Sequence, residues 1–191
     1  MTLKPIIKTA LLCFTVSLAI TSCSNENKDS KKTAEEMNEQ KFDKEGEDAA
    51  DKLVHAYSAN MFEIKAAENA ALNAITPEVK KLSAMLVEAH TKMNADVKIL
   101  ADLKNISLPT DLTEEQRKDL EKLAEKTGLE YDKAFVEKMK TKHEAAVKFY
   151  EETAAKCDDE AIKNWAAITT PEVRSHLDMV LVTENDIKDK K

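Results

Sequence analysis

The strongest constraint on the fold is the helical periodicity of residues 129–150, which read LEYDKAFVEKMKTKHEAAVKFY. Spacings of three and four place six of them on one helix face: Asp132, Val136, Met139, His143, Ala146 and Tyr150. Phe135, Val147 and Phe149 widen this face into a band that requires burial against other helices. Two members of the band, Asp132 and His143, are polar, and buried polar groups cost free energy unless they find partners. The band therefore predicts a helix inside a bundle, with polar partners supplied by other helices.

The remainder of the chain is also helical in character. It contains only two glycines and four prolines, with 42% hydrophobic and 34% charged residues. Few helix breakers and few aromatic residues favour an all-α protein. Four long segments with apolar stripes and short connections predict a four-helix bundle over residues 47–183.

The boundaries of these helices follow from capping residues and prolines. We expect helices over 47–75, 77–104, 129–156 and 171–183, a short helix opened by the capping box Thr113–Gln116 and ended by Gly128, and another short helix before a break at Thr170-Pro171. In the first helix two stripes alternate, one with larger apolar residues and one with small ones. The larger stripe is Val54, Tyr57, Met61, Ile64, Ala71 and Ile75, and the small stripe is Ala56, Asn60, Glu63, Ala67, Ala70 and Ala74. In the later helices Leu103, Ile168 and Leu181 are also expected to face inward, and residues 184–191 form a charged, frayed tail.

The N-terminal residues 1–22 have the pattern of an export signal. Lys4 and Lys8 precede an apolar run of about a dozen residues, which is too short for a membrane-spanning helix. The run ends in Ile20-Thr21-Ser22-Cys23, which resembles the lipobox of bacterial lipoproteins and implies that Cys23 is acylated. Because Ser24 follows, we expect a lipid anchor in the outer membrane; an ordinary secretory signal with an incidental cysteine is the alternative. Residues 23–46 are polar and are expected to form a flexible tether.

Charge and cysteine content narrow the possible partners. The net charge is −7, and removal of the signal would leave −9, because Lys4 and Lys8 are its only charges. An acidic chain without a basic patch argues against nucleic acid as a partner. Three cysteines give no disulfide framework, so we interpret Cys157 as a partly buried apolar residue rather than an intermolecular disulfide.

Three of the four histidines, His90, His143 and His176, lie on or beside the inward stripes of three different helices. Glu63 or Glu68 from the first helix could add a carboxylate. Asp132 and His143 are about 16 Å apart along their helix, so they cannot both bind one metal ion. Each histidine also has a methionine about one turn away, namely Met93, Met139 and Met179. This pattern predicts a site for a divalent metal or Cu(I), with two alternatives: the methionines fill the core, and the histidines make only interhelical contacts.

Several expected signatures of enzymes are missing. No histidine is preceded three positions earlier by a carboxylate, as the di-iron bundles require, and no hydrolase, phosphate-loop or metalloprotease motif occurs. We therefore expect a binding protein that is not an enzyme.

These features resemble a bacterial family known as domain of unknown function 4142, whose members are described as outer membrane proteins with a ferritin-like bundle. The resemblance covers about Met61 to Met179, and Ala89 departs from the acidic residue usual in the family. It rests on the segments around Met61–Ile64, Met85–Lys92, Leu108-Pro109, Tyr131–Val136, His143–Phe149 and Pro171–Leu177. It implies recurrent polar positions at Glu63, His90, Asp132, His143 and His176, which favours Glu63 over Glu68.

The leading hypothesis is an envelope lipoprotein whose bundle binds a metal ion or small ligand at an internal His/carboxylate site. The alternative is a structural or protein-interaction module with packed histidines. The hypothesis requires His176, only five residues after Pro171, to reach the level of His90 and His143 near the middle of their helices.

Overall fold

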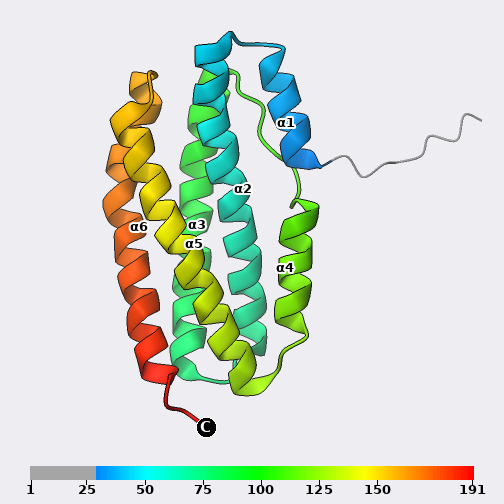
Figure 1. Ribbon diagram of the computed structural model, residues 1–191, viewed down its shortest axis with the longest axis vertical. Helices are drawn as coiled ribbons and strands as arrows, with labels where there is room; N and C mark the ends of the chain where they lie inside the picture. Colours follow the sequence, from blue (N-terminus) through cyan, green and yellow to red (C-terminus); the bar gives the residue numbers. More distant parts are fainter. Residues whose placement is uncertain (1–28) are drawn as a thin grey trace, which may run out of the picture.

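The computed structural model describes residues 29–191 and is an all-α helical bundle (Figure 1). The described residues form six helices and no strand: α1 Ser30–Glu39, α2 Lys44–Asn73, α3 Pro77–Lys104, α4 Glu114–Ala124, α5 Gly128–Lys156 and α6 Glu160–Ile187. The four long helices lie alongside one another, with α2 against α3 and α5 against α6. The short helices α1 and α4 pack on one side of this arrangement, against α2 and α5 respectively.

Capping side chains set several of the helix starts. Thr76 accepts a hydrogen bond from the Val79 N–H at 3.4 Å, and Pro77 follows it at the first helical position. The predicted capping box is confirmed, because Thr113 and Gln116 exchange bonds of 2.9 and 3.1 Å between side chain and backbone. Helices α3 and α4 therefore begin where the sequence predicts.

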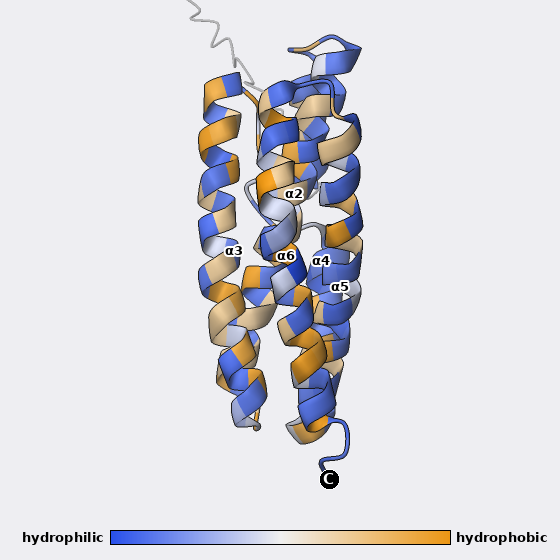
Figure 2. Cartoon of the chain, turned by 90° about the vertical axis from the view of Figure 1, so that its left-hand side faces the viewer, coloured by the Kyte–Doolittle hydropathy of each residue, from blue (hydrophilic) through white to orange (hydrophobic). Residues whose placement is uncertain are grey.

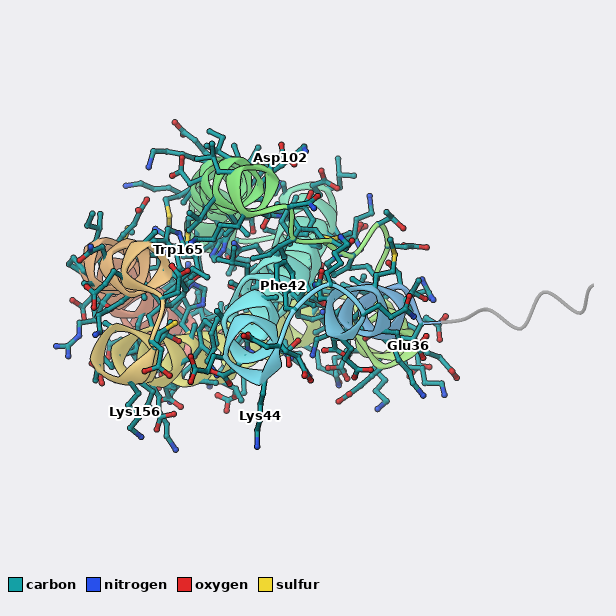
Figure 3. The ribbon with its side chains drawn as sticks, turned by 90° about the horizontal axis from the view of Figure 1, so that it is seen from above. Glu36, Phe42, Lys44, Asp102, Lys156 and Trp165 are labelled. Atoms are coloured by element: carbon teal, nitrogen blue, oxygen red, sulfur yellow. The ribbon has the colours of Figure 1, made fainter. Side chains whose placement is uncertain are left out.

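The core runs along the inner faces of the four long helices. Viewed from above in Figure 3, the labelled Lys44 and Lys156 side chains point outward, whereas Trp165 lies between helices. Figure 2 shows apolar and polar segments alternating along each helix, as expected of amphipathic helices. Leu103, Ile168 and Leu181 are exposed, at 80%, 77% and 38%, which contradicts the prediction that they face inward. At about 100° per residue, each lies more than about 90° from the centre of the buried face of its helix, outside the strip that the bundle covers.

On α2 the bundle buries the stripe of small residues more completely than the stripe of larger ones. The alanines of the small stripe are almost inaccessible, whereas in the larger stripe Val54 is buried but Ile75, just beyond the end of α2, is 59% exposed. Small side chains let neighbouring helices approach closely, so the polar residues of that stripe, Asn60 and Glu63, are carried into the interior.

The segment expected to be a flexible tether, 23–46, contains a helix. Residues 30–39 form α1, and Asn38 is completely buried. The Asn38 amide donates to the Ser107 carbonyl at 3.0 Å and accepts from the Ser107 N–H at 2.8 Å. These long-range bonds dock α1 on the loop between α3 and α4. Composition alone did not indicate them, since α1 is polar overall.

The predicted break at Pro171 is wrong, because α6 continues through it (Figure 1). A proline inside a helix removes one backbone donor and crowds the preceding turn. Here the Thr169 and Thr170 hydroxyls donate to the Trp165 and Ala166 carbonyls at 2.8 Å. Thr170 therefore bonds back within the helix and does not cap a new one.

The C-terminal end is more ordered than the expected frayed tail. α6 extends to Ile187, which is buried, and the Lys190 ammonium pairs with Glu78 at 2.7 Å. Cys157 is buried and free, in agreement with its interpretation as an apolar residue. Across residues 29–191, none of the helices has the length and apolar character needed to cross a bilayer. The predicted signal and Cys23 lie outside the described residues.

Candidate metal centre

Each of the four long helices places one chemically distinctive side chain in the interior, away from its ends. Glu63 belongs to α2, His90 to α3, His143 to α5 and His176 to α6, and all four are buried. His176 lies sixteen residues after Glu160 because α6 is continuous, so it reaches the level of His90 and His143. The continuity of α6 through Pro171 thus removes the main difficulty of the hypothesis, which was how His176 could reach the level of the other two histidines.

The three histidines converge as predicted. One ring nitrogen from each lies within 4.8 Å of one from each of the others. The ring centroids are 5.3 Å apart for His90 and His143, 5.4 Å for His90 and His176, and 5.8 Å for His143 and His176. The closest pair of nitrogens is His90 Nε2 and His143 Nε2, at 3.3 Å.

Hydrogen bonds at the outer nitrogens orient two of these rings. The His90 Nδ1–H donates to Asn60 Oδ1 at 2.9 Å, and the His143 Nδ1–H donates to the Met139 carbonyl at 2.9 Å. A neutral imidazole that donates from Nδ1 has its lone pair on Nε2. Both lone pairs therefore point into the cluster, which is the arrangement typical of metal-binding histidines.

Glu63 places a carboxylate beside the histidine cluster. Its Oε2 lies 3.2 Å from His90 Nε2 and 3.3 Å from His143 Nδ1. Neither contact has the geometry of a hydrogen bond, and Oε2 is a buried acceptor without a donor within the described structure. The His176 Nδ1 is likewise buried without a hydrogen-bond partner there. Such unpartnered polar atoms are costly unless a ligand satisfies them.

Burial favours the neutral form of His90 and His176 by lowering their pKa values. Desolvation lowers the pKa of His90, although the neighbouring Glu63 carboxylate acts in the opposite direction. Desolvation also lowers the pKa of His176 to about 3, with further contributions from His90 and His143. Neutral imidazole is the form that binds a metal ion.

The distances fit a metal ion better than direct contact. In a tetrahedral site with metal–ligand bonds of about 2.0–2.1 Å, neighbouring ligand atoms are about 3.3 Å apart. His90 Nε2 lies at 3.3 Å from His143 Nε2 and at 3.2 Å from Glu63 Oε2. Without a cation, the two Nε2 lone pairs would face each other. The residues present can therefore hold a metal ion, and a ring nitrogen of His176 lies within 4.8 Å of the nitrogens of the other two histidines.

The other predicted site residues lie elsewhere or act indirectly. Asp132 is fully buried, but its carboxylate accepts from the N–H groups of Ile75 and Thr76 at 3.1 and 2.8 Å, so it fixes the connection between α2 and α3. Glu68 pairs with Lys65 at 2.9 Å on the surface. Met179 is 37% exposed, Met93 is buried in the core, and Met139 contributes its carbonyl to His143.

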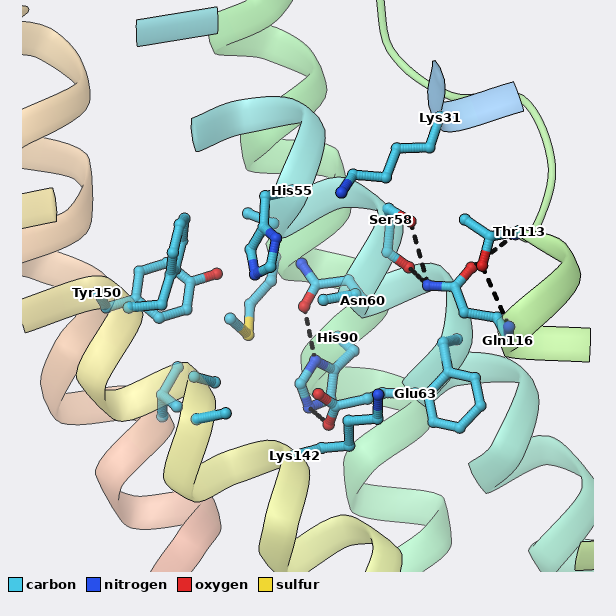
Figure 4. A pocket seen from close by; sticks show the side chains of 18 of the residues that line it. Lys31, His55, Ser58, Asn60, Glu63, His90, Thr113, Gln116, Lys142 and Tyr150 are labelled. Carbon is cyan, nitrogen blue, oxygen red and sulfur yellow. Dashed lines mark hydrogen bonds and ion pairs between the residues drawn. The ribbon is translucent and has the colours of Figure 1, made fainter. Parts of the chain in front are cut away.

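Sequence reasoning missed two features of the centre. The sequence places Asn60, which orients His90, in the small stripe of α2 but does not predict its role. Its position one turn before Glu63 on the same face could have indicated that it lies near the site. The second is a cavity of about 250 Å³ that reaches Glu63 and His90 from the side of α1 and α4 (Figure 4). Gln116 of α4 lines it and donates to the Ser58 carbonyl at 2.9 Å.

Comparison with known proteins agrees with the predicted family. The family model described as Domain of unknown function (DUF4142) matches residues 32–181. The chain belongs to this family. The match includes α1 from Lys32 onward and all four helices of the centre, so the DUF4142 domain begins within the segment expected to be a tether. Neither the curated proteins nor the solved structures give a significant match.

Proposed function

We propose that this DUF4142 protein is a lipid-anchored protein of the cell envelope that binds a divalent transition-metal ion inside its helical bundle. Glu63, His90, His143 and His176 are the proposed ligands. The single observation that carries the proposal is the opposed pair of His90 and His143 Nε2 atoms, 3.3 Å apart, with both Nδ1–H groups already committed to acceptors.

The donor set favours a borderline metal such as Zn²⁺. Imidazole suits Zn²⁺, Cu²⁺, Fe²⁺ and Ni²⁺, whereas Cu(I) prefers thioether and thiolate ligands. A carboxylate at Glu63 and the exposure of Met179 argue against a methionine-rich Cu(I) site. We further propose that α2, α3, α5 and α6 form a ferritin-like four-helix arrangement, one ligand from each helix, without the ligand motif of the di-iron proteins.

The alternative is a structural or interaction module in which the histidines only pack. For both rings to stay neutral, packing alone would require the Asn60 amide to be turned so that its nitrogen donates to His90 Nδ1. With the Asn60 oxygen facing His90, packing alone would require a proton between the two Nε2 atoms and would make one of the imidazoles a cation. Burial opposes this, since desolvation lowers the pKa of His90. The unpartnered Glu63 Oε2 and His176 Nδ1 also find no explanation in packing.

The proposed location depends on the N-terminal sequence. The lipobox-like Ile20–Cys23 supports acylation of Cys23 and anchoring in the outer membrane, and the acidic charge of the chain is compatible with a protein that does not bind nucleic acid. We propose no catalytic role.

The test is the metal content and Zn²⁺ affinity of the full chain, purified without a histidine tag. We expect about one metal ion per chain, and loss of high-affinity binding in His143→Ala and Glu63→Gln. His55→Ala and Glu68→Gln are matched controls, because both residues lie on α2 outside the cluster. Wild-type protein that binds no more Zn²⁺ than His143→Ala would refute the proposal and leave the packing alternative.

A further inference from the structure

The cavity above the metal centre carries donors that the centre itself does not use. Its floor is formed by Glu63 and His90, and its walls include Lys31 of α1, Asn60 of α2, and Lys142 and Tyr150 of α5 (Figure 4). It is partly open to solvent, so a small molecule could enter it without rearrangement of the long helices.

Asn60 is the most informative of these donors. The residue is 3% exposed, its Oδ1 accepts from His90, and its Nδ2 is buried without an acceptor in the described structure. In Figure 4 the amide nitrogen points away from His90, into the cavity on the side of His55. A buried donor aimed into a cavity indicates a ligand that accepts hydrogen bonds.

The charges around the cavity also suit an anion. The Lys142 ammonium lies 4.9 Å from the centroid of the Phe62 ring and makes no ion pair within residues 29–191. Of the two carboxylates from α4 that line the cavity, Asp119 is paired with Lys138 at 2.9 Å, and Glu115 is exposed, where salt and water screen its charge. The Lys142 ammonium therefore remains available to a ligand.

Charge balance at the centre gives the ligand its sign. A divalent ion bound by three neutral imidazoles and the Glu63 carboxylate leaves one positive charge in a buried site. An uncompensated buried charge is costly, and the other buried polar side chains of the cavity wall, such as Asn60 and Tyr150, are neutral and cannot offset it. One negative charge in the cavity would offset the positive charge of the metal centre.

We propose that the cavity next to the metal centre binds a small monovalent carboxylate, which accepts a hydrogen bond from the Asn60 amide and is attracted by the Lys142 ammonium. This inference rests on the proposed metal centre. One carboxylate oxygen can accept from Asn60 Nδ2, and the Lys142 ammonium, which lies in Figure 4 on the Glu63 side of the cavity, attracts the negative charge through space. The protein would then bind metal and carboxylate cooperatively, each increasing affinity for the other by the same factor.

The test measures the Zn²⁺ affinity of the full chain by competition with a chromogenic chelator, with and without formate, at constant ionic strength. Blanks with chelator alone correct for binding of formate to free Zn²⁺. We expect saturating formate to tighten Zn²⁺ binding about tenfold. In Asn60→Asp, one oxygen still accepts from His90 while the other replaces the donor with a negative charge, so Zn²⁺ affinity should no longer depend on formate.

Two further variants make the result specific. Asn73→Asp adds the same charge to an exposed position of α2 and should keep the full formate effect. Lys142→Gln, on a partly exposed residue, should weaken the effect even if Asn60→Asp folds poorly. Histidine-dependent Zn²⁺ binding that ignores formate would overturn this inference and leave the metal centre intact. A formate effect that persists in both Asn60→Asp and Lys142→Gln would place the anion outside this cavity and overturn it too. Absence of Zn²⁺ binding would refute the proposed function and, with it, the inference.

Discussion

The neutral state of His176 predicts that the metal-free protein loses stability in mild acid. Burial lowers the pKa of His176 from 6.5 to about 3, so the unfolded chain binds a proton there well before the folded one does. The folded-state pKa is depressed, and the residue is a base. The stabilising contribution is therefore complete above the unfolded pKa and decreases as the pH falls from about 6.5 toward about 3.

The size of the effect follows from the two pKa values. Between about pH 7 and pH 5 most unfolded chains gain this proton and almost no folded chains do, which lowers the free energy of unfolding by about 2 kcal/mol. Water near the cavity reduces this value somewhat. His176 itself is only 4% exposed, so most of the desolvation remains.

The assay is urea denaturation in the presence of a chelator, followed by helical circular dichroism from about pH 7 to pH 5, for wild type and His176→Leu. The variant has no proton to gain, so its stability relative to wild type should rise by about 2 kcal/mol over this range. Val180→Ala, at a buried position one turn further along α6, removes packing without a titrating group, and its stability difference should not change with pH. A constant difference between wild type and His176→Leu would show that His176 is hydrated or protonated in the fold, and the reasoning would fail.

Three other perturbations follow from the contacts of single residues. Asp132→Ala removes the acceptor of two backbone N–H groups at the α2–α3 connection and should lower the free energy of unfolding by about 3 kcal/mol or more in urea denaturation. The control Glu130→Ala breaks an exposed ion pair with Lys126 and should cost at most about 1 kcal/mol. Equal effects of the two substitutions would contradict the role given to Asp132. Pro171→Ala restores a backbone donor inside α6 and should raise the free energy of unfolding by about 1–3 kcal/mol in the same assay, while a loss of stability would mean that the bundle depends on the proline geometry. Cys23→Ala should abolish labelling with palmitate and leave an unprocessed precursor; normal cleavage of the variant, with no label on the wild type, would exclude the lipid anchor.

The sequence predicts correctly those site residues whose burial follows from helical periodicity alone. His143 and Asp132 lie in a strongly periodic band, and both are buried as expected. The position of His176 was harder to predict. A Thr-Pro pair can stand at the start of a helix or inside one, and the sequence at Thr170-Pro171 does not distinguish the two. Two threonine hydroxyls that bond back along α6 accompany the continuous helix, and such bonds leave no mark on hydrophobic spacing.

The role of Asp132 and the order of α1 could not be predicted for a related reason. A polar residue on a core face predicts that partners exist, but not whether they are a metal ion or backbone N–H groups at a distant turn. Similarly, α1 has few apolar residues to give a periodic signal, and Asn38 docks it through hydrogen bonds to Ser107, 69 positions away. Contacts of this kind depend on the final packing of the chain.

The docking of α1 connects the proposed anchor with the proposed site. Asp29, the first described residue, lies six positions after Cys23, and six residues of fully extended chain cover at most about 20 Å. The Ser30 hydroxyl accepts from the Thr110 and Asp111 N–H groups at 2.6 and 3.0 Å, so the start of α1 is fixed to the bundle. Lys31, the next residue, lines the cavity that leads to Glu63 and His90. If Cys23 carries the lipid, the start of α1 is therefore held within about 20 Å of the membrane surface, and the part of the cavity that Lys31 lines adjoins this point. Metal ions and carboxylates that enter through this cavity would then reach the centre from solvent close to the lipid surface.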